Sequence, residues 1–318
     1  MAKIGIFDSG YGGLTILEAI RRELPQYDYL YLGDNARAPY GTHSFDVIYR
    51  YTLQAVKYLF SQDCALVILA CNTASAKALR TIQQKDLPLI NDPYGEADRS
   101  NEGRLEMVND QMVNVLGVIR PTVEAVPSIT KTGHVGILAT PATVSSESYV
   151  LELEKIAKLP NDQINDQMVN DQMVNAQPFT VVQQACPLWV PLIENGEHLN
   201  PGADYFVDKY LQQILEKDPL IDTLILGCTH YPLLLPKISQ WIRNNGKRFA
   251  ASDIQVISQG YLEAKSLADY LVRHPEYESQ LSQGGSCHYL TTENADRFSQ
   301  SASLFLSSPV QAEHIDLE

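Results

Sequence analysis

Short apolar runs alternate with longer amphipathic stretches along most of the chain. Each short run is rich in aliphatic and β-branched residues, as is typical of a buried strand. We expect strands at Lys3–Phe7, Tyr27–Leu32, Ala65–Leu69, Val115–Val118, His134–Leu138, Phe179–Gln183, Thr223–Leu226, Ile254–Ile257 and Cys287–Leu290. Apolar residues at helical spacing predict helices at Leu14–Leu24, Ser44–Phe60, Thr73–Gln84, Ala203–Leu215 and Gly260–Val272. The alternation predicts an α/β protein whose parallel sheet is covered by helices on both faces.

Two pairs of segments repeat the same pattern in the two halves of the chain. Ala65–Thr73 and Asp222–His230 each combine an apolar run with a small residue, a cysteine and then polar residues. Ile4–Ser9 and Val135–Thr140 each contain a glycine within an apolar run that ends in polar residues. Ligands of parallel sheets bind beyond the carboxyl ends of the strands. We therefore expect two similar Rossmann-like lobes, related by a pseudo-twofold axis, with the active site in the cleft between them.

The domain boundaries are expected near two segments that lack periodicity. We assign residues 1–91 plus 260–318 to lobe one and residues 115–259 to lobe two. The segments 92–114 and 159–177 are polar and carry copies of the hexapeptide Asn-Asp-Gln-Met-Val-Asn. We interpret both as insertions into surface loops, because the entropy of loop closure rises only slowly with length. A lid or a partner-binding element is the alternative.

The composition excludes two broad classes of protein. The 318 residues are 45% hydrophobic and carry a net charge of −14, with no basic patch of the kind that binds nucleic acid. No long uncharged apolar run is present, so we expect no membrane span. The chain opens directly on a strand and shows no signal peptide, which predicts a cytoplasmic protein.

The five cysteines are the first candidates for chemistry. Their odd number and wide spacing argue against a disulfide framework, and no spacing of Cys and His indicates a zinc or other metal site. Cys64, Cys186 and Cys287 are interpreted as core residues, because buried and inert is the usual state of a free cysteine. Cys71 and Cys228 differ, since they occupy matching positions in the two halves.

Two thiols on opposite sides of a substrate suit the inversion of a stereocentre. One thiol can remove a proton from one face while the other delivers a proton to the opposite face. A free thiol has a pKa of ~8.5, so we expect a modest downward shift to produce a thiolate near neutral pH. The small residues Ala70 and Gly227 are expected to leave room for a substrate carbon beside each sulfur. Asn72, Thr73 and Thr229 could hold a carboxylate, together with N–H groups at helix N-termini.

Four motifs in order make the chain recognisable. They are Asp8–Leu14 (DSGYGGL), Gly33–Gly41 (GDNARAPYG), Ala70–Ala74 (ACNTA) and Gly227–Pro232 (GCTHYP). On these motifs the chain resembles the glutamate racemases of the aspartate/glutamate racemase superfamily. The resemblance extends over nearly the whole chain outside the two insertions.

The resemblance implies a role for each matching position. Cys71 would be the base that serves D-glutamate, and Cys228 the base that serves L-glutamate. The residues implied in glutamate binding are Asp8, Ser9, Pro39, Tyr40, Gly41, Asn72, Thr73, Thr140, Thr143 and Thr229. The residues implied as auxiliary polar groups near the thiols are Asp34, Glu194 and His230. Glu197 is an alternative to Glu194, because it lies three positions further along the chain.

Structural roles remain open for several of these residues. Asp8 could cap the helix that starts near Gly12. His230 could be a structural histidine rather than a partner that tunes the thiol. Asp34 could only form a turn with Gly33, and Tyr40 with its following glycine could likewise be turn chemistry.

The expected function is interconversion of L- and D-glutamate by proton transfer between two thiols, without pyridoxal phosphate, a metal or another cofactor. The resemblance further implies a homodimer that supplies D-glutamate for peptidoglycan. Pro39, Tyr40 and Gly41 favour glutamate over a rival substrate within the superfamily, such as aspartate. A non-catalytic binding module on the same fold is the second alternative, and the intact pair of cysteines argues against it.

Overall fold

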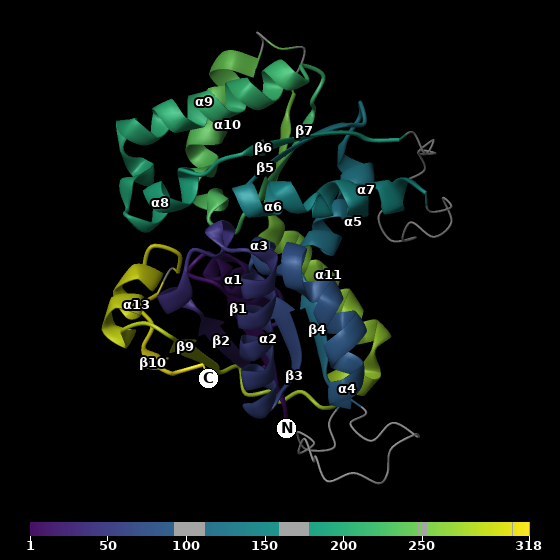
Figure 1. The fold of residues 1–318 in the computed structure, drawn as a ribbon, viewed down its shortest axis with the longest axis vertical. Helices are drawn as coiled ribbons and strands as arrows, with labels where there is room; N and C mark the ends of the chain where they lie inside the picture. The colour runs from purple at the N-terminus through teal and green to yellow at the C-terminus, as the bar shows by residue number, and fades with distance from the viewer. Residues whose placement is uncertain (92–111, 159–177, 247–248, 250–252, 307, 318) are drawn as a thin grey trace. The chain divides into compact units, whose positions relative to one another are not determined.

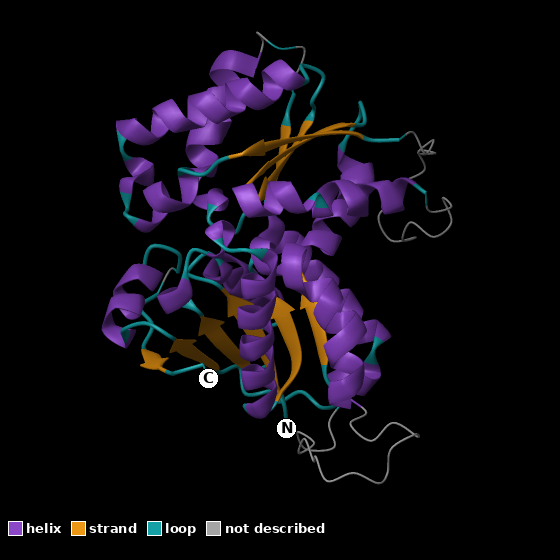
Figure 2. Ribbon diagram, viewed as in Figure 1, coloured by secondary structure: helices purple, strands orange, loops and turns teal. Residues whose placement is uncertain are grey.

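A computed structural model describes residues 1–91, 112–158, 178–246, 249, 253–306 and 308–317 (Figure 1). The chain divides into two compact units. The first unit comprises Met1–Val118 and Ala264–Glu318, and the second comprises Ile119–Glu263. Each unit is built around its own sheet, with helices beside the strands (Figure 2).

The sheet of the first unit has six strands among the described residues, in the order β10-β9-β2-β1-β3-β4, and its neighbouring strands are all parallel. Its strands are β1 (Lys3–Asp8), β2 (Tyr29–Gly33), β3 (Cys64–Leu69), β4 (Asn114–Gly117), β9 (Cys287–Thr291) and β10 (Ala312–His314). Its helices are α1 (Gly13–Glu23), α2 (Phe45–Ser61), α3 (Asn72–Ala74), α4 (Leu87–Asn91), α12 (Pro275–Glu278) and α13 (Ala295–Ala302). The helix α11 (Gln259–Arg273) begins in the second unit and ends in the first.

Burial explains why the central strands read as continuous apolar runs. Every residue of β3 is buried, on both faces of the sheet. A strand covered on both faces gains from apolar side chains at every position rather than at every second one. On α2, Ile48, Ala55 and Leu59 are buried at helical spacing and join the same core as Val67 and Leu69 of β3.

The sheet of the second unit has four strands among the described residues, in the order β6-β5-β7-β8, again all parallel. Its strands are β5 (His134–Ala139), β6 (Thr180–Ala185), β7 (Thr223–Gly227) and β8 (Gln255–Ile257). Its helices are α5 (Ile119–Ile129), α6 (Pro141–Ser146), α7 (Ser148–Ala157), α8 (Trp189–Glu194), α9 (Pro201–Lys217) and α10 (Leu235–Asn245).

The two sheets share one topology. The order β2-β1-β3-β4 in the first unit matches β6-β5-β7-β8 in the second, strand for strand in chain order. Cys71 and Cys228 both follow the third strand of their unit, separated from it by at most one residue. The prediction of two similar α/β lobes with parallel sheets is therefore confirmed, and the internal echo of the sequence corresponds to equivalent strands.

The first expected boundary lay too early along the chain. We had assigned residues from 115 onward to the second lobe, but β4 hydrogen-bonds to β3 and so belongs to the first unit. The end of the first expected insertion also belongs to this unit. The N–H of Val113 donates to Asn91 Oδ1 at 2.9 Å, and Asn114 Nδ2 donates to the Tyr270 hydroxyl at 2.7 Å. Residues 92–111 and the second expected insertion, 159–177, lie outside the described residues.

The helix expected at Thr73–Gln84 has a different winding. After the short α3, the segments Ser75–Leu79 and Ile82–Asp86 are π-helical. Ala78 and Ile82 are nevertheless buried, as the apolar pattern predicted. The pattern identifies which residues face inward, but it does not distinguish two helical windings that bury the same side chains. The sequence also left α5, α7 and α10 unassigned; a proline lies inside α5 and near the start of α10.

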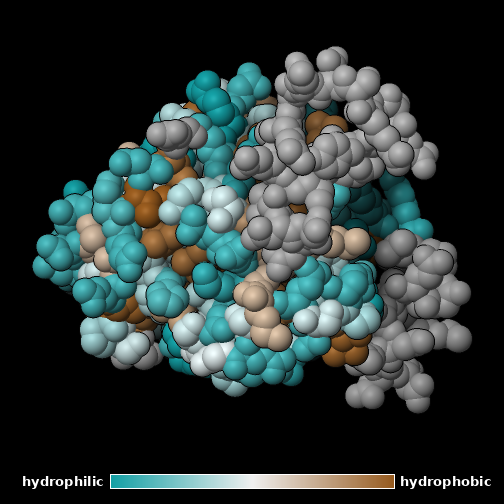
Figure 3. Space-filling view, turned by 90° about the horizontal axis from the view of Figure 1, so that it is seen from below, coloured by the Kyte–Doolittle hydropathy of each residue, from teal (hydrophilic) through white to brown (hydrophobic). Residues whose placement is uncertain are grey.

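The surface agrees with the acidic, polar composition. On the face shown in Figure 3, hydrophilic residues cover much of the surface and hydrophobic residues lie in small groups between them. Within the described ranges, the helices are too short or too polar to cross a bilayer.

Candidate active site

In the first unit, candidate residues lie at the carboxyl ends of three adjacent strands. Asp8 is the last residue of β1, Asp34 follows β2, and Cys71 follows β3 after Ala70. The backbone joins these ends, since Asp34 N donates to Asp8 O at 2.9 Å and Ala70 N donates to Phe7 O at 2.8 Å. The parallel register therefore brings residues that are far apart in sequence to one edge of the sheet.

Cys71 is a buried thiol with two hydrogen-bonding neighbours. Its Sγ lies 3.2 Å from the Ser9 hydroxyl and accepts the backbone N–H of Ala74 at 3.4 Å. Burial and the nearby Asp8 carboxylate raise the pKa of Cys71 to about 12, although the hydrogen bonds from Ser9 and Ala74 act in the opposite direction. The expectation of a modest downward shift is thus wrong for Cys71 in the unliganded protein, because desolvation and a like charge outweigh the donors.

Asp8 is not the N-cap residue of the helix that follows it. Its carboxylate is 1% exposed and accepts the backbone N–H of Gly10 at 3.0 Å. The N-cap residue of α1 is Gly12, and it makes no side-chain capping bond. A Cβ on Gly13 would lie 2.5 Å from the Asp8 Cβ, so only glycine allows α1 to start this close to the carboxylate. The carboxylate is thereby held at the strand end beside Cys71.

The Asp34 carboxylate is buried within the turn that follows β2 and forms hydrogen bonds there. This carboxylate has no exposed surface and accepts hydrogen bonds from Arg37, from the Tyr40 hydroxyl and from the Thr292 hydroxyl. Tyr40 is buried, while Pro39 is exposed and Gly41 is partly exposed. The side chain of Tyr40 therefore points inward, towards Asp34.

In the second unit, candidate residues again lie at strand ends. Thr140 follows β5, and Cys228 follows β7 directly. Thr140 is the N-cap of α6: its Oγ1 accepts the backbone N–H of Thr143 at 3.3 Å, and the two hydroxyls lie 3.0 Å apart. Thr229 is buried beside Cys228. In the first unit, Asn72 and Thr73 are likewise buried beside Cys71, at the start of α3.

Cys228 lies next to a histidine that is itself paired with a carboxylate. Its Sγ lies 3.8 Å from His230 Nδ1, and His230 Nε2 lies 2.9 Å from Glu194 Oε1. Burial disfavours the charged imidazole, but hydrogen bonds to Cys228 and Glu194 outweigh it and raise the pKa of His230 to about 10. Glu197 instead accepts a hydrogen bond from Asn200. Of the two glutamates considered, Glu194 is the one in contact with His230.

The small residue before Cys228 has a packing role. A Cβ on Gly227 would lie 3.1 Å from the Ala139 Cβ and 3.2 Å from a ring carbon of Tyr149. The space is therefore already filled, and the expectation that Gly227 leaves room for substrate is wrong. Tyr149, which is not among the predicted site residues, accepts a hydrogen bond from Gln259 at its hydroxyl at 3.0 Å. No local motif marks either residue.

The other three cysteines have mixed surroundings. Cys64 is fully buried in the core of the first unit, and Cys287 is partly buried. Cys186 directly follows β6, and its backbone carbonyl accepts a hydrogen bond from the Tyr231 hydroxyl at 3.2 Å. Among the described residues, no three or more His, Cys, Asp or Glu side chains are arranged to hold a metal ion.

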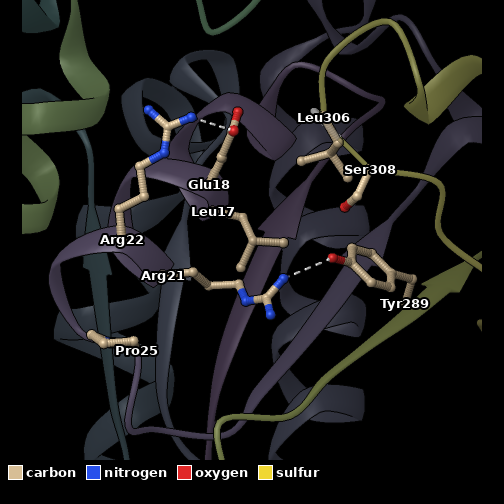
Figure 4. A pocket seen from close by; sticks show the side chains of 8 residues that line it. All are labelled: Leu17, Glu18, Arg21, Arg22, Pro25, Tyr289, Leu306 and Ser308. Carbon is tan, nitrogen blue, oxygen red and sulfur yellow. Dashed lines mark hydrogen bonds and ion pairs between the residues drawn. The ribbon is translucent and has the colours of Figure 1, made fainter.

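A cavity of ≈ 250 Å³ lies in the first unit, away from the strand-end residues (Figure 4). Arg21 and Leu17 of α1, Tyr289 of β9 and Leu306 are among the residues that line it. Arg21 donates to the Tyr289 hydroxyl at 3.3 Å, and Figure 4 shows this pair directed toward each other. None of the predicted site residues lines this cavity, so it is not the candidate active site.

Comparisons with known proteins place the chain in a family. A glutamate racemase from a Ruegeria species is 37% identical over 98% of this chain and 98% of its own length. A glutamate racemase isoform from Bacillus anthracis has a similar structure, with a TM-score of 0.75 and 27% identity over 99% of this chain and 98% of its own. A Francisella tularensis glutamate racemase, solved in complex with D-glutamate, has a TM-score of 0.74 and 27% identity over 100% of this chain and 98% of its own. No family model matches the sequence. On the full-length identity and the shared two-unit fold, this chain belongs to the glutamate racemase family.

Proposed function

We propose that the protein interconverts L- and D-glutamate by moving a proton between Cys71 and Cys228 without a cofactor. The observation that carries the proposal is the equivalent position of the two thiols. Each follows the third strand of a sheet with the same topology, and each has polar groups beside its sulfur. Membership of the glutamate racemase family supports the choice of substrate.

The strand-end residues provide groups of the right kind for an amino acid. The buried Asp8 carboxylate and the Ser9 hydroxyl suit the substrate ammonium group. The backbone of residues 39–41 suits the side-chain carboxylate. Hydroxyl and amide groups at positions 72, 73, 140, 143 and 229 suit the α-carboxylate and the region around it. These local donors are needed because the net charge of −14 repels an anionic substrate at long range.

Substrate binding is expected to activate Cys71. In the unliganded protein, burial and the negative charge of Asp8 hold its pKa at about 12, so the group is a thiol. An ammonium group placed against Asp8 would offset that negative charge. The pKa of Cys71 would then fall, because the like-charge contribution of Asp8 is removed. The Ser9 hydroxyl and the Ala74 N–H already point at the sulfur and would stabilise the thiolate.

Cys228 has a different proton partner. A protonated His230 can donate to the Cys228 sulfur through Nδ1, while Glu194 stabilises the positive ring through Nε2. With D-glutamate bound, the Cys71 thiolate removes the α-proton and the Cys228 thiol protonates the opposite face, giving L-glutamate. The reverse reaction exchanges the two roles. Hydrogen bonds to the α-carboxylate stabilise the carbanion that lies between the two transfers.

A chiral assay tests the function. Purified protein is incubated separately with L-glutamate, D-glutamate and L-aspartate in D₂O, with EDTA and without pyridoxal phosphate. We expect either glutamate enantiomer to reach an equal mixture of both, with deuterium at the α-carbon of the product. Racemisation of aspartate alone would identify the rival substrate, and no racemisation at all would favour a non-catalytic binding module. Activity that EDTA abolishes would contradict the cofactor-independent mechanism.

The biological setting is part of the same proposal. Its family membership supports a cytoplasmic homodimer that supplies D-glutamate for peptidoglycan. Growth of a D-glutamate auxotroph on expression of this chain tests the supply role. Light scattering of the purified protein tests the dimer; a mass of one chain, 35.5 kDa, at all concentrations would contradict it.

A further inference from the structure

The turn that follows β9 lies against the candidate site of the first unit. β9 runs parallel to β2, and the register pairs Gly33 with Thr291. Asp34 directly follows β2 and Thr292 directly follows β9, so two residues 258 positions apart in the sequence come into contact. All the contacts described below lie within the first unit.

Thr292 bridges the start of the turn that follows β2. Its hydroxyl donates to Asp34 Oδ1 at 2.9 Å and accepts the backbone N–H of Ala36 at 3.0 Å. Its own backbone N–H donates to Gly33 O at 3.1 Å. One hydroxyl therefore satisfies both a buried carboxylate and a backbone donor on the same turn.

Arg37 holds Asp34 from the other side. Its Nε lies 2.7 and 3.0 Å from the two oxygens of the Asp34 carboxylate. Its Nη1 donates to Gln54 Oε1 at 2.7 Å, and its guanidinium carbon lies 4.1 Å from the centre of the Tyr51 ring. Both of these partners are on α2, so Arg37 links the turn to a long helix.

Asp34 in turn contacts the segment of residues 39–41 through Tyr40. The Tyr40 hydroxyl donates to the Asp34 carboxylate, and the Tyr40 ring packs against Phe7 and Tyr51. A carboxylate without exposed surface requires all its donors, because a buried charge that loses a partner is costly. The conformation of Tyr40 and Gly41 is therefore coupled to Thr292 and Arg37 through one carboxylate.

We propose that Thr292 and Arg37 are positioning residues that hold the backbone of residues 39–41 in its glutamate-binding conformation through the buried carboxylate of Asp34. This rests on the proposed function, since the assignment of residues 39–41 to the side-chain end of glutamate comes from the family resemblance. Neither positioning residue touches the substrate. Their effect is on binding, because they act on the end of the substrate that is remote from the α-carbon.

The test uses Thr292→Val, which keeps the shape of the side chain but removes the hydroxyl, and Thr292→Ser as the matched control. A hydrogen bond to a charged group contributes more than one between neutral groups. We therefore expect KM for both glutamate enantiomers to rise on the order of tenfold in Thr292→Val. A loss of binding that is equal in the ground state and the transition state leaves kcat within about twofold. Thr292→Ser should keep KM within about twofold of the starting protein, because it retains the hydroxyl.

Hydrogen–deuterium exchange of residues 34–43 provides a second measurement that does not need activity. We expect faster exchange in this segment in Thr292→Val than in Thr292→Ser, because only the Thr292→Val variant loses the hydroxyl that donates to the buried carboxylate. The proposal is overturned if Thr292→Val and Thr292→Ser behave alike, if exchange of residues 34–43 is unchanged in Thr292→Val, or if kcat falls in Thr292→Val while KM stays constant. If the starting protein does not racemise glutamate, the proposed function fails, and the exchange result still decides whether Thr292 anchors the turn.

Discussion

Cys71 and Cys228 occupy equivalent strand ends but have different surroundings. Both side chains are 6% exposed, so burial does not distinguish them. Cys71 has neutral donors, the Ser9 hydroxyl and the Ala74 N–H, with a carboxylate nearby. Cys228 instead has the ring of His230, which is itself bound to Glu194. The shared topology sets the position of a thiol, and the neighbouring loops set its electrostatics.

The difference indicates how each thiol gains or loses its proton. Next to Cys228 is a group with a raised pKa that can keep a proton at neutral pH and donate it to sulfur. The hydrogen-bonding neighbours of Cys71 described above, Ser9 and Ala74, are neutral groups, and the Asp8 charge works against ionisation. In the proposed mechanism, His230 therefore supplies a proton donor to the thiol of the second unit. The ionisation of Cys71 in the first unit depends instead on the ammonium group of the substrate.

Replacement of either thiol should have the largest effect. We expect Cys71→Ser and Cys228→Ser each to lower kcat by about 10³-fold or more, because a hydroxyl is a far weaker acid and base at neutral pH. Chiral chromatography of the product measures the rate. Cys64→Ser, at a buried position outside the proposed mechanism, is the control for nonspecific loss. Activity within tenfold of the starting protein in either catalytic variant would overturn the two-thiol mechanism.

Replacement of His230 should slow the Cys228 step selectively. We expect His230→Asn to lower kcat by about 10²-fold, since it removes the proton donor to the Cys228 sulfur. The two enantiomers are equally stable, so kcat/KM must fall equally in both directions. The contrast should instead appear in the isotope effect, which should grow more with α-deuterated L-glutamate than with α-deuterated D-glutamate. Equal isotope effects would remove the proposed link between His230 and one thiol.

Glu194 and Glu197 provide a matched pair. We expect Glu194→Gln to lower the pKa of His230 below its value of about 10, because the imidazolium loses its negative partner. The rate should fall on the order of tenfold. Glu197→Gln should leave both properties within about twofold, because Glu197 is bound to Asn200 instead. Titration of His230 by NMR measures the pKa, and similar behaviour of the two variants would contradict the assignment of Glu194.

The smallest effects should be on the reactivity of Cys71 in the unliganded protein. Its pKa of about 12 predicts that alkylation by iodoacetamide rises with pH up to at least pH 10 without a plateau. Asp8→Asn removes a like charge and should lower the pKa, speeding alkylation at pH 8 several-fold. Ser9→Ala removes a donor to the thiolate and should slow it. Mass spectrometry of the peptide that contains Cys71 measures both, and changes in the same direction would contradict this account of the thiol.

Much of the secondary structure could be predicted because it depends on short, local sequence patterns. Seven strands were predicted to within one residue at each end, since buried parallel strands are short continuous apolar runs: β1, β3, β4, β5, β7, β8 and β9. The boundary between the two units was harder to predict. Val113 and Asn114 belong to a copy of the polar hexapeptide repeat. In the structure, however, Asn114 is the first residue of β4, and Val113 is buried next to it. Which residues fill a gap in a core depends on neighbours that local patterns do not reveal.

Local sequence patterns were enough to predict the two α/β halves, the positions of Cys71 and Cys228 and the motifs of the family, because each is encoded in a few consecutive residues. The direction of the pKa shift at Cys71, the pairing of Glu194 with His230 and the contact between Asp34 and Thr292 follow from the folded structure alone. These depend on burial and on the distance between charged groups. Both are set by strands and turns that the fold brings together from distant parts of the chain.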